Sequence, residues 1–336
     1  MTEGTIDVDS LRRLAELADY TVPTTIRALA ELRVADRLAD GDRTVEELAE
    51  AVGAHAPSLL RAMRGLAALG VFTEVAPGRF ANSDMSDLMR ADRPHSLQGC
   101  LPLMQADLQA WAALDHTLAT GEPAFPRVHG ETYYEYLARR PAESARFDAS
   151  QQGATQLELR AALRGYDWGA LGTLVDVGGG NGTFLAGVLQ RHPGLRGVLF
   201  DLPFVVELSE PVLAEHGVAD RCEVVGGSFF DGVPAGHDAY LLKRTLYNWD
   251  AESAVRILRS VRQAMRPGSR LLIFEPTSRP GDRFDVARLT DVIMLVFTGG
   301  ALRTIEQLEA LLDEADLRLL RLVPTPMFPI LEIDGK

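Results

Sequence analysis

The stretch Leu174-Val175-Asp176-Val177-Gly178-Gly179-Gly180-Asn181-Gly182 decides the fold of this 336-residue chain. Its aliphatic and β-branched residues predict a buried strand, and its glycines predict a turn that opens the helix TFLAGVLQRH. Glycines let a ligand approach the backbone closely, and the N-terminus of a helix offers free N–H groups. The stretch therefore predicts a ligand-binding turn that follows a buried strand.

Short β-branched runs alternate with helical segments from about residue 166 onward. The runs are TLVDVG, RGVLFDL, CEVVGG, DAYLLK and SRLLIFEP, with Pro267-Gly268 as the turn before the fifth run. Such alternation predicts a parallel sheet with helices on both faces. The chain ends in LRLLRLVPTPMFPILEI, where Pro324 and Pro326 exclude a helix and predict a closing hairpin.

The glycine-rich turn departs from the dinucleotide fingerprint GxGxxG. Counting from Gly178, the third glycine position holds Thr183, which makes a pyrophosphate site the weaker interpretation. Asp201 closes the next strand, 23 residues after Gly178, where a carboxylate can accept the hydroxyls of a ribose. Together these features predict a nucleoside-type ligand.

The N-terminal region has the pattern of a winged helix-turn-helix. Apolar residues predict a helix over residues 24–38, Thr44 to Glu47 form a capping box, and VFTEVAPGRFANS predicts a hairpin. Residues 1–100 carry 11 arginines, no lysine and 16 acidic residues, whereas DNA-binding domains normally present a basic face. An oligomerisation module on this scaffold is therefore favoured over a DNA reader. Residues 96–165 are predicted to be helical throughout.

The composition sets further limits on function. The net charge of −13 opposes binding to nucleic acid, and the only lysines among the 34 basic residues are Lys243 and Lys336. No apolar run reaches the roughly 20 residues that span a bilayer, and the start MTEGTIDVDS lacks the layout of a secretory signal, which predicts a cytoplasmic protein. Two isolated cysteines and the absence of clustered ligand residues predict no disulfide framework and no metal site.

Several motifs in fixed order carry a resemblance to a known family. They are LVDVGGGNGTFLAGVLQRHP, GVLFDLP, GGSFFDGVP, LLKRTLYNWDAESAVRILRSVRQAMRPGSRLLIFEP and DVIMLVFTGGALRT, behind the winged-helix region. Over nearly the whole chain the sequence resembles S-adenosylmethionine-dependent small-molecule O-methyltransferases of the plant caffeate and bacterial polyketide and anthracycline type. The resemblance implies an α/β fold, in which a Rossmann-like class I methyltransferase sheet follows an N-terminal all-α winged-helix dimerisation domain. It implies a homodimer whose chains have three parts: a dimerisation domain at 1–95, a helical lid over the acceptor at 96–165, and a catalytic domain at 166–336.

The same resemblance assigns residues to S-adenosylmethionine. Gly178 would pass the methionine part, Asp201 would hold the ribose, and Ser228 and Phe229 would flank the adenine. Lys243 matches a family lysine that contacts the cofactor, and an internal lysine in an arginine-rich chain supports the assignment. The alternative for Lys243 is a surface lysine whose stem covers apolar atoms. Trp249 is expected to pack beside the cofactor or in the core.

The family's general base is absent from this sequence. A histidine and an aspartate are expected four and five residues after the lysine, where this chain has Tyr247 and Asn248. Glu275 matches one supporting carboxylate, and Leu302 stands at the position of a second. Tyrosine, with an ordinary pKa of about 10, is a poor base at neutral pH but can orient a substrate by hydrogen bonding. Tyr247 and Glu275 are the predicted catalytic residues, acting chiefly through orientation of the acceptor.

Three further residues are candidates for contact with the acceptor. Met294 lies in DVIMLVF, which resembles the family's acceptor wall, and is favoured over the neighbouring Asp291. His129, in the predicted lid, could reach an acceptor or serve as a structural histidine. Asn248 completes the predicted substrate-binding set.

Three functions follow from these observations. The leading hypothesis is methylation of a hydroxyl on an aromatic or polyketide-like secondary metabolite. The missing histidine keeps open a second hypothesis, in which the chain binds the cofactor but acts as a hydroxylase, decarboxylase or cyclase. A ligand-sensing transcription factor is the third, and the acidic composition argues against it.

Overall fold

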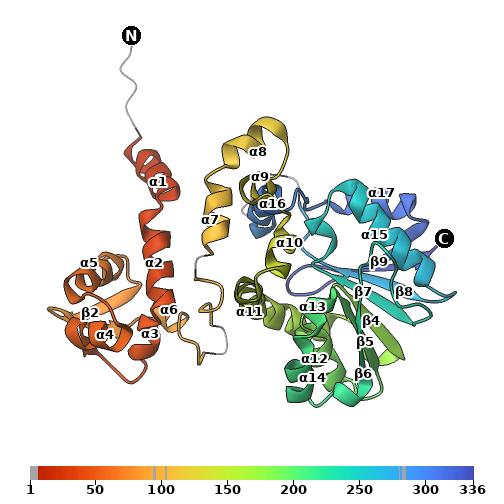
Figure 1. Ribbon diagram of the computed structural model, residues 1–336, viewed down its shortest axis with the longest axis horizontal. Coiled ribbons are helices and arrows are strands. Elements are labelled where there is room, and N and C mark those ends of the chain that lie inside the picture. Colours follow the sequence, from red (N-terminus) through yellow and green to blue (C-terminus); the bar gives the residue numbers. More distant parts are fainter. Residues whose placement is uncertain (1–6, 94–95, 103, 280, 282–284) are drawn as a thin grey trace, which may run out of the picture. The chain divides into compact units, whose positions relative to one another are not determined.

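The computed structural model describes residues 7–93, 96–102, 104–279, 281 and 285–336. The chain divides into two compact units, Met1–Met104 with Ala149–Gly153, and Gln105–Asp148 with Ala154–Lys336 (Figure 1). In the described residues no helix combines the length and the apolar character needed to cross a membrane.

The N-terminal unit is mainly helical and carries a small wing. Its strands pair antiparallel in the order β1-β3-β2, so the predicted hairpin is confirmed and the unit is not all-α. Its core contains Leu48, Met63 and Phe80, each with no exposed side-chain surface. The elements are α1 Val8–Ala18, α2 Thr21–Glu31, α3 Val34–Arg37, β1 Arg43–Thr44, α4 Val45–Val52, α5 Ala56–Ala67, β2 Phe72–Ala76, β3 Arg79–Asn82 and α6 Asp84–Asp87.

The helix predicted over residues 24–38 is wrong as one continuous element. The chain breaks after α2 because Arg33 adopts a left-handed conformation, with φ of 57°. The break reorients the chain so that Val34 and Ala35, at 0% and 1% exposure, enter the core. Burial of these apolar side chains outweighs helical propensity, which is worth only tenths of a kcal/mol per residue.

The second unit is built on a seven-stranded sheet of order β6-β5-β4-β7-β8-β10-β9 (Figure 1). The first five strands in this order are parallel, and β9 and β10 form the predicted antiparallel hairpin. The strands are β4 Thr173–Val177, β5 Arg196–Asp201, β6 Cys222–Gly226, β7 Ala239–Lys243, β8 Arg270–Phe274, β9 Leu317–Val323 and β10 Ile330–Gly335.

Alternate residues of each central strand enter two separate cores. Val175 and Tyr240 pack with α15 Ala251–Ala264 and α17 Ile305–Glu314 on one face. Leu174 and Leu241 pack on the other face with α12 Thr183–Arg191 and α14 Ser209–Glu215. Helices on both faces explain why these strands are apolar throughout rather than alternating with polar residues.

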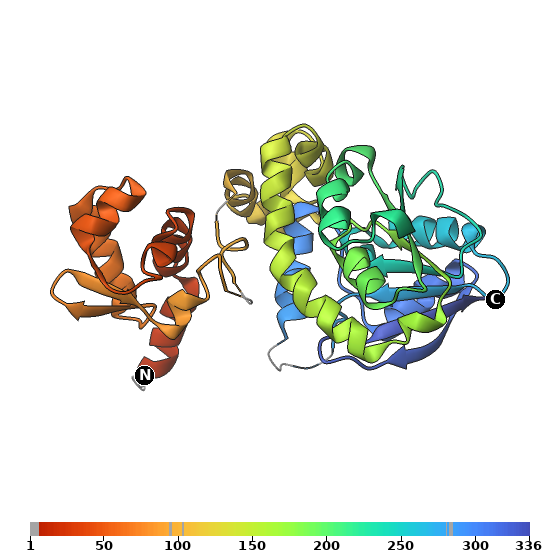
Figure 2. The same cartoon turned by 90° about the horizontal axis from the view of Figure 1, so that it is seen from below.

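Helices between residues 105 and 165 form a layer beside α16 Val286–Phe297 (Figure 2). The aromatic side chain of Phe125 packs against Tyr133, Tyr136 and Phe297, the last of which belongs to α16. The prediction of helix throughout 96–165 is confirmed only in part: five separate helices with short breaks follow from residue 105, and the described residues 96–102 and 104 lie outside helices. The layer comprises α7 Gln105–Trp111, α8 Leu114–Thr120, α9 Ala124–His129, α10 Tyr133–Ala138 and α11 Pro141–Gly165.

The capping box predicted at the start of α4 is confirmed and can be tested. The Thr44 hydroxyl accepts from the Glu47 N–H, and the Glu47 carboxylate accepts from the Thr44 N–H at 2.7 Å. Thr44→Ala should destabilise α4 by about 1 kcal/mol, which raises amide hydrogen exchange in α4 roughly fivefold. Thr25→Ala, which removes an exposed hydroxyl bonded within α2, is the matched control. Unchanged exchange in α4 of the Thr44 variant would contradict the assignment.

Candidate functional site

The residues predicted to bind the cofactor lie at or after the carboxyl ends of β4, β5, β6 and β7, whereas Glu275 follows β8, and Met294 and His129 lie in α16 and α9. β4 lies between β5 and β7: β5 and β6 follow on one side, and β7 and β8 lie on the other, so the strand order reverses at β4. Ligands of open α/β sheets bind outside the carboxyl ends of the strands at such a reversal. The topology thus places the glycine-rich turn at the position where a binding crevice is expected.

The turn after β4 requires glycine for two physical reasons. Gly178, Gly180 and Gly182 have φ of 74°, 62° and 83°, a region that side chains other than glycine rarely adopt. A Cβ at Gly179 would lie 2.7 Å from Cγ of Asp176, whereas one at Gly180 would meet nothing within 4 Å. The turn therefore packs tightly on its inner side and leaves its outer side open to a ligand.

Asp201 ties the end of β5 to this turn. Its Oδ2 accepts from the Gly180 N–H at 2.8 Å, and its Oδ1 accepts from the Leu202 N–H at 2.7 Å. Burial raises the pKa of Asp201, and these two hydrogen bonds oppose the rise. Each carboxylate oxygen keeps a second lone pair, so a pair of ligand hydroxyls can still be accepted.

Phe229 brings an aromatic ring to the turn from the loop after β6. Its Cε1 lies 3.7 Å from the position of a Cβ on Gly178, and its ring packs edge-on against Trp249 at 5.7 Å. The Ser228 hydroxyl accepts from the Phe230 N–H at 3.2 Å, which orients this loop. Tyr134, which the sequence did not single out as a site residue, stacks on Trp249 with centroids 6.0 Å apart.

Lys243 is buried in an ion pair instead of lying along the surface. Its Nζ is 2.8 Å from Oε2 of Glu158 and donates to the Thr155 hydroxyl at 3.1 Å, and the side chains of Lys243 and Glu158 are 12% and 3% exposed. Burial lowers the pKa of Lys243, while Glu158 opposes the change. Asp176 lies beneath the turn, where burial raises its pKa to about 7 against the effect of Lys243.

Tyr247 lies in a short 3₁₀ helix, η3 Leu246–Asn248, and is 3% exposed. Its phenol oxygen accepts from Nε of Arg244 at 2.8 Å. Burial raises the pKa of Tyr247, and Arg244 opposes the rise. The phenol is therefore neutral at neutral pH. In this form it can donate a hydrogen bond but cannot act as a general base.

Glu275 and Asn248 bind the backbone of the same segment. Oε2 of Glu275 accepts from the N–H groups of Leu246 and Tyr247 at 3.1 and 3.4 Å. Burial raises the pKa of Glu275 to about 7, and the guanidinium of Arg303 opposes the rise. The Asn248 amide donates to the Arg244 carbonyl at 2.9 Å. Both polar side chains thus hold the position of the segment that carries Tyr247.

The wall beside Tyr247 is apolar. Tyr247, Ala287 and Leu302 form one buried cluster, with Met294 packed against it. Asp291 accepts from the Leu302 N–H at 2.7 Å, which gives this carboxylate a structural role. His129 is placed with its Nε2 3.1 Å from the Ala106 carbonyl and its ring 4.3 Å from that of Phe125.

Sequence reasoning missed Arg244, Glu158 and Tyr134. Arg244 follows the conspicuous Lys243, and Tyr134 stands in the aromatic run YYEY, so a signal existed for both. Glu158 is one of several acidic residues in predicted helices, and nothing in the sequence distinguishes it. Its importance emerges only when α11 is placed against the end of β7.

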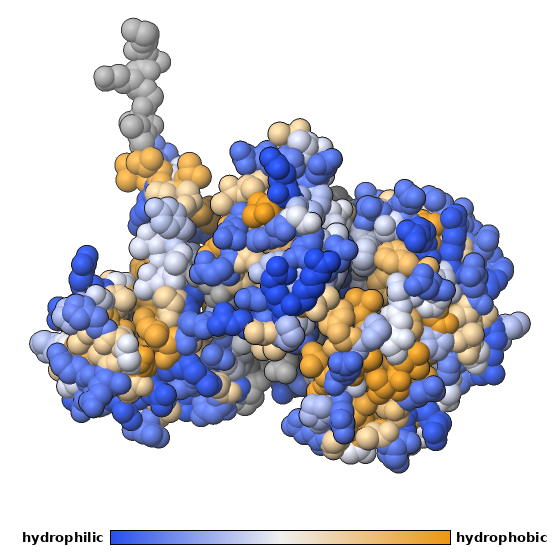
Figure 3. All heavy atoms as spheres, in the orientation of Figure 1, coloured by the Kyte–Doolittle hydropathy of each residue, from blue (hydrophilic) through white to orange (hydrophobic). Residues whose placement is uncertain are grey.

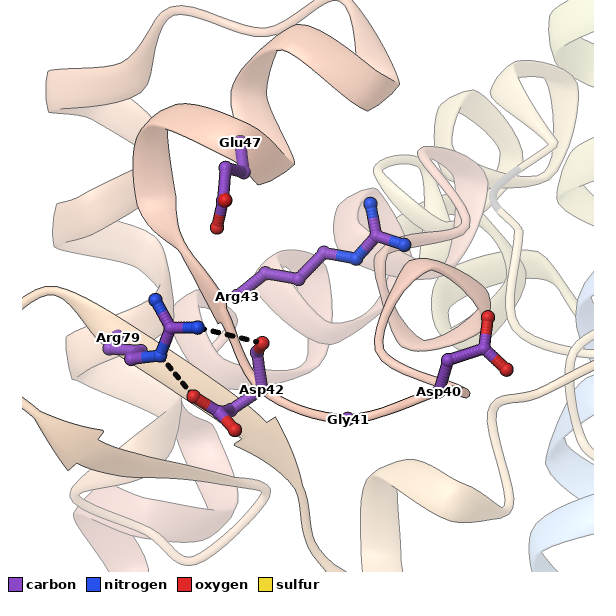
Figure 4. Close-up of a pocket in the computed structure, with 6 residues that line it drawn as sticks. All are labelled: Asp40, Gly41, Asp42, Arg43, Glu47 and Arg79. Carbon is purple, nitrogen blue, oxygen red and sulfur yellow. Dashed lines mark hydrogen bonds and ion pairs between the residues drawn. The ribbon is translucent and has the colours of Figure 1, made fainter.

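A separate hollow lies on the N-terminal unit (Figure 4). It has a volume of about 300 Å³, and two of its lining residues, Arg79 and Asp42, form an ion pair. It contains none of the predicted site residues. Its lining is Asp40, Gly41, Asp42, Arg43, Glu47 and Arg79. In the described part of the chain no cluster of three or more His, Cys, Asp or Glu side chains could hold a metal ion.

Comparisons with known proteins show the family to which the chain is related. Residues 111–318 match the O-methyltransferase domain family, and residues 15–92 match the O-methyltransferase dimerisation domain. A phenazine O-methyltransferase of Lysobacter antibioticus is 37% identical over 324 residues, which cover 96% of this chain and 94% of that protein. An aclacinomycin 10-hydroxylase of Streptomyces purpurascens is 35% identical, with 94% and 85% covered.

A solved structure extends the likeness to the fold. It is an O-methyltransferase from neocarzinostatin biosynthesis in complex with S-adenosylmethionine and 2-hydroxy-5-methyl naphthoic acid. The TM-score is 0.86 at 35% identity, with 96% of this chain and 98% of that chain covered.

The packing behind Tyr247 yields a direct test. A Cβ at Gly300 would lie 2.5 Å from the Asn248 carbonyl carbon and 2.8 Å from its oxygen, so Gly300→Ala must displace the backbone of this segment. We expect a loss of about 1–3 kcal/mol in stability, measured by thermal unfolding. Gly194→Ala is the control, because a Cβ there meets nothing within 4 Å. Equal stability of the two variants would refute the close approach.

Proposed function

Because the chain belongs to the family of S-adenosylmethionine-dependent O-methyltransferases, we propose that it methylates an acidic hydroxyl of a flat aromatic, polyketide-like metabolite. The observation that carries the proposal is the placement of Tyr247 and the apolar wall of Met294 and Leu302 in the unit that also holds the glycine-rich turn. Apolar walls with few polar groups suit fused aromatic rings. The phenazine and naphthoic acid named for two relatives are such ring systems.

The residues present fit S-adenosylmethionine. The open outer side of Gly180 admits a ligand to the backbone, and Asp201 can accept the ribose hydroxyls. Phe229 offers a ring face or edge to the adenine, with Ser228 orienting its loop and Trp249 packed against it. Lys243 and Gly178 complete the set, the lysine by fixing the end of β7 beside the turn.

When bound, the cofactor would supply a methyl group on a sulfonium. The acceptor oxygen would form the new C–O bond with a lone pair, the methyl–sulfur bond would break with its electron pair staying on sulfur, and the hydroxyl proton would pass to solvent. The protein's part is to align the acceptor and exclude water. Orientation alone is worth roughly 7–11 kcal/mol, whereas general-base catalysis typically adds 10²–10⁴-fold. Tyr247 would orient the acceptor by hydrogen bonding, and Glu275 and Asn248 would position Tyr247 through the backbone.

A second function is favoured by one relative. The aclacinomycin 10-hydroxylase covers nearly the same length at 35% identity, so the fold also supports reactions outside methyl transfer. Formation of S-adenosylhomocysteine with a methylated acceptor supports the proposal. Altered acceptor without S-adenosylhomocysteine supports the second function instead.

Binding of S-adenosylmethionine can be tested without knowing the acceptor. Asp201→Ala removes an acceptor for two ligand hydroxyls, so calorimetry should show affinity reduced at least tenfold, the scale of hydrogen bonds to a charged group at about 1.5–3 kcal/mol. Asp220→Ala, at an exposed position in η2 Ala219–Arg221, is the matched control. Absence of binding by the folded wild-type protein would reject both enzyme functions.

We propose further that two copies of the chain associate through the N-terminal unit. The dimerisation-domain match covers residues 15–92, and α1 leaves a row of apolar side chains exposed, as Figure 3 shows. Leu11, Leu14 and Leu17 are 60%, 66% and 67% exposed, and Val8 is 70% exposed. An apolar row on one side of a helix is costly in water and is suited to packing against a second copy.

The dimer has a simple test. Leu11→Glu with Leu14→Glu places charges in the apolar row, so sedimentation should show monomers at concentrations where the wild type is dimeric. Leu118→Glu, a change at a 72% exposed leucine on α8, is the control and should leave the dimer intact. A dimeric double variant would show that α1 is not part of the interface.

A further inference from the structure

Arg244 is held in a fixed position beside Tyr247. Its backbone is left-handed, with φ of 53°, its N–H donates to the Phe274 carbonyl at 3.1 Å, and its carbonyl accepts from Asn248. Its guanidinium lies between the Tyr247 phenol, 2.8 Å from Nε, and Glu158, 3.6 Å from the nearer nitrogen. Arg244 is thus held both at its backbone and at its guanidinium.

This arrangement decides the direction of the hydrogen bond at Tyr247. A guanidinium has only donors, so the phenol oxygen must accept from Arg244 and its own hydrogen must point elsewhere. Among the described residues none accepts that hydrogen. Tyr247 therefore offers a hydrogen-bond donor at the edge of the apolar wall formed with Leu302 and Met294.

The hydrogen bond from Arg244, rather than a net charge, makes Tyr247 prefer an electron-rich ligand atom. Lys243 and Arg244 both face the carboxylate of Glu158, and Asp176 also acts on Lys243. Glu275 also faces η3, but its carboxylate accepts from the backbone N–H of Leu246. The nearby guanidinium of Arg303 opposes the rise in the pKa of Glu275. The phenol of Tyr134 also lies near Tyr247. Burial raises the pKa of Tyr134, and Tyr247 adds to this rise.

We propose that Arg244 is a specificity-determining positioning residue, which turns Tyr247 into a donor for an anionic oxygen and so makes the site select acceptors in their phenolate form. The acceptor class is a hydroxyl conjugated to a carbonyl, whose negative charge is shared between both oxygens. Its proton leaves to solvent before binding, so no side chain has to remove it. This inference rests on the proposed methyl-transfer function and deepens it.

The test measures the ionisation of a bound phenol and requires no turnover. The probe is 2-hydroxyanthraquinone, a phenol conjugated to a quinone carbonyl whose visible absorption changes on ionisation. It is titrated with pH while bound to wild-type protein saturated with S-adenosylhomocysteine. We expect the pKa of the bound probe to lie at least one unit below that of the free probe, which means that the phenolate binds at least tenfold more tightly than the phenol.

Variants separate positioning from general structural support. Tyr247→Phe keeps the ring in the apolar cluster but removes the donor, and Arg244→Met removes the partner of the phenol. Both should lose most of the tenfold preference, while Arg244→Lys, which keeps a charge and a donor, should retain part of it. Because Arg244 acts through Tyr247, the double variant should match Tyr247→Phe alone. Arg259→Met, at an arginine bonded to the Glu314 carbonyl, is the control and should keep the full preference.

Three results would overturn the inference. They are an unshifted probe in the wild type, a wild type that does not bind the probe, and an effect of Arg244→Met that persists in the Tyr247→Phe background. Assay of S-adenosylhomocysteine and methylated product with a panel of hydroxylated aromatic acceptors distinguishes these failures from failure of the proposed function. Methyl transfer that persists with any of these results removes the role of Arg244 only.

Discussion

The ion pair between Glu158 and Lys243 is the contact on which the site depends. It joins α11 to the carboxyl end of β7 through side chains that are 3% and 12% exposed, with Nζ and Oε2 2.8 Å apart. Breaking a buried pair by removing one partner costs about 3–5 kcal/mol, because the remaining charge is left in a poorly solvated position. The same carboxylate faces Arg244, so one interaction orders both cations that lead into η3.

Most polar groups near η3 are committed to holding the backbone. Glu275 accepts from two of its N–H groups, Asn248 donates to the carbonyl of Arg244, and Arg303 donates to the carbonyls of Leu246 and Trp249. The consequence is a rigid segment that presents a phenol to an apolar wall. A site of this kind accelerates a reaction by orientation and by electrostatic preference rather than by proton abstraction.

The sequence predicted the parts of the molecule that depend on local chemistry. The strand and glycine turn at Leu174 to Gly182, the capping box at Thr44 and the hairpin forced by Pro324 and Pro326 are all present. The sequence could not predict the break at Arg33, because burial of Val34 and Ala35 overrides the local helical pattern. Nor could it find Glu158 or the pairing of Arg244 with Tyr247, since both depend on how distant segments meet. The residues proposed to bind the cofactor could be singled out from the sequence because they follow successive strands of one sheet.

We propose that this enzyme transfers a methyl group without a general base of its own. The most direct measurement is the pH dependence of kcat/KM for a series of quinonoid phenols of graded acidity. We expect each profile to rise with the ionisation of its own acceptor and to be flat for acceptors that are already ionised. One inflection that is shared by all acceptors and removed by Glu275→Gln would instead reveal a general base in the protein.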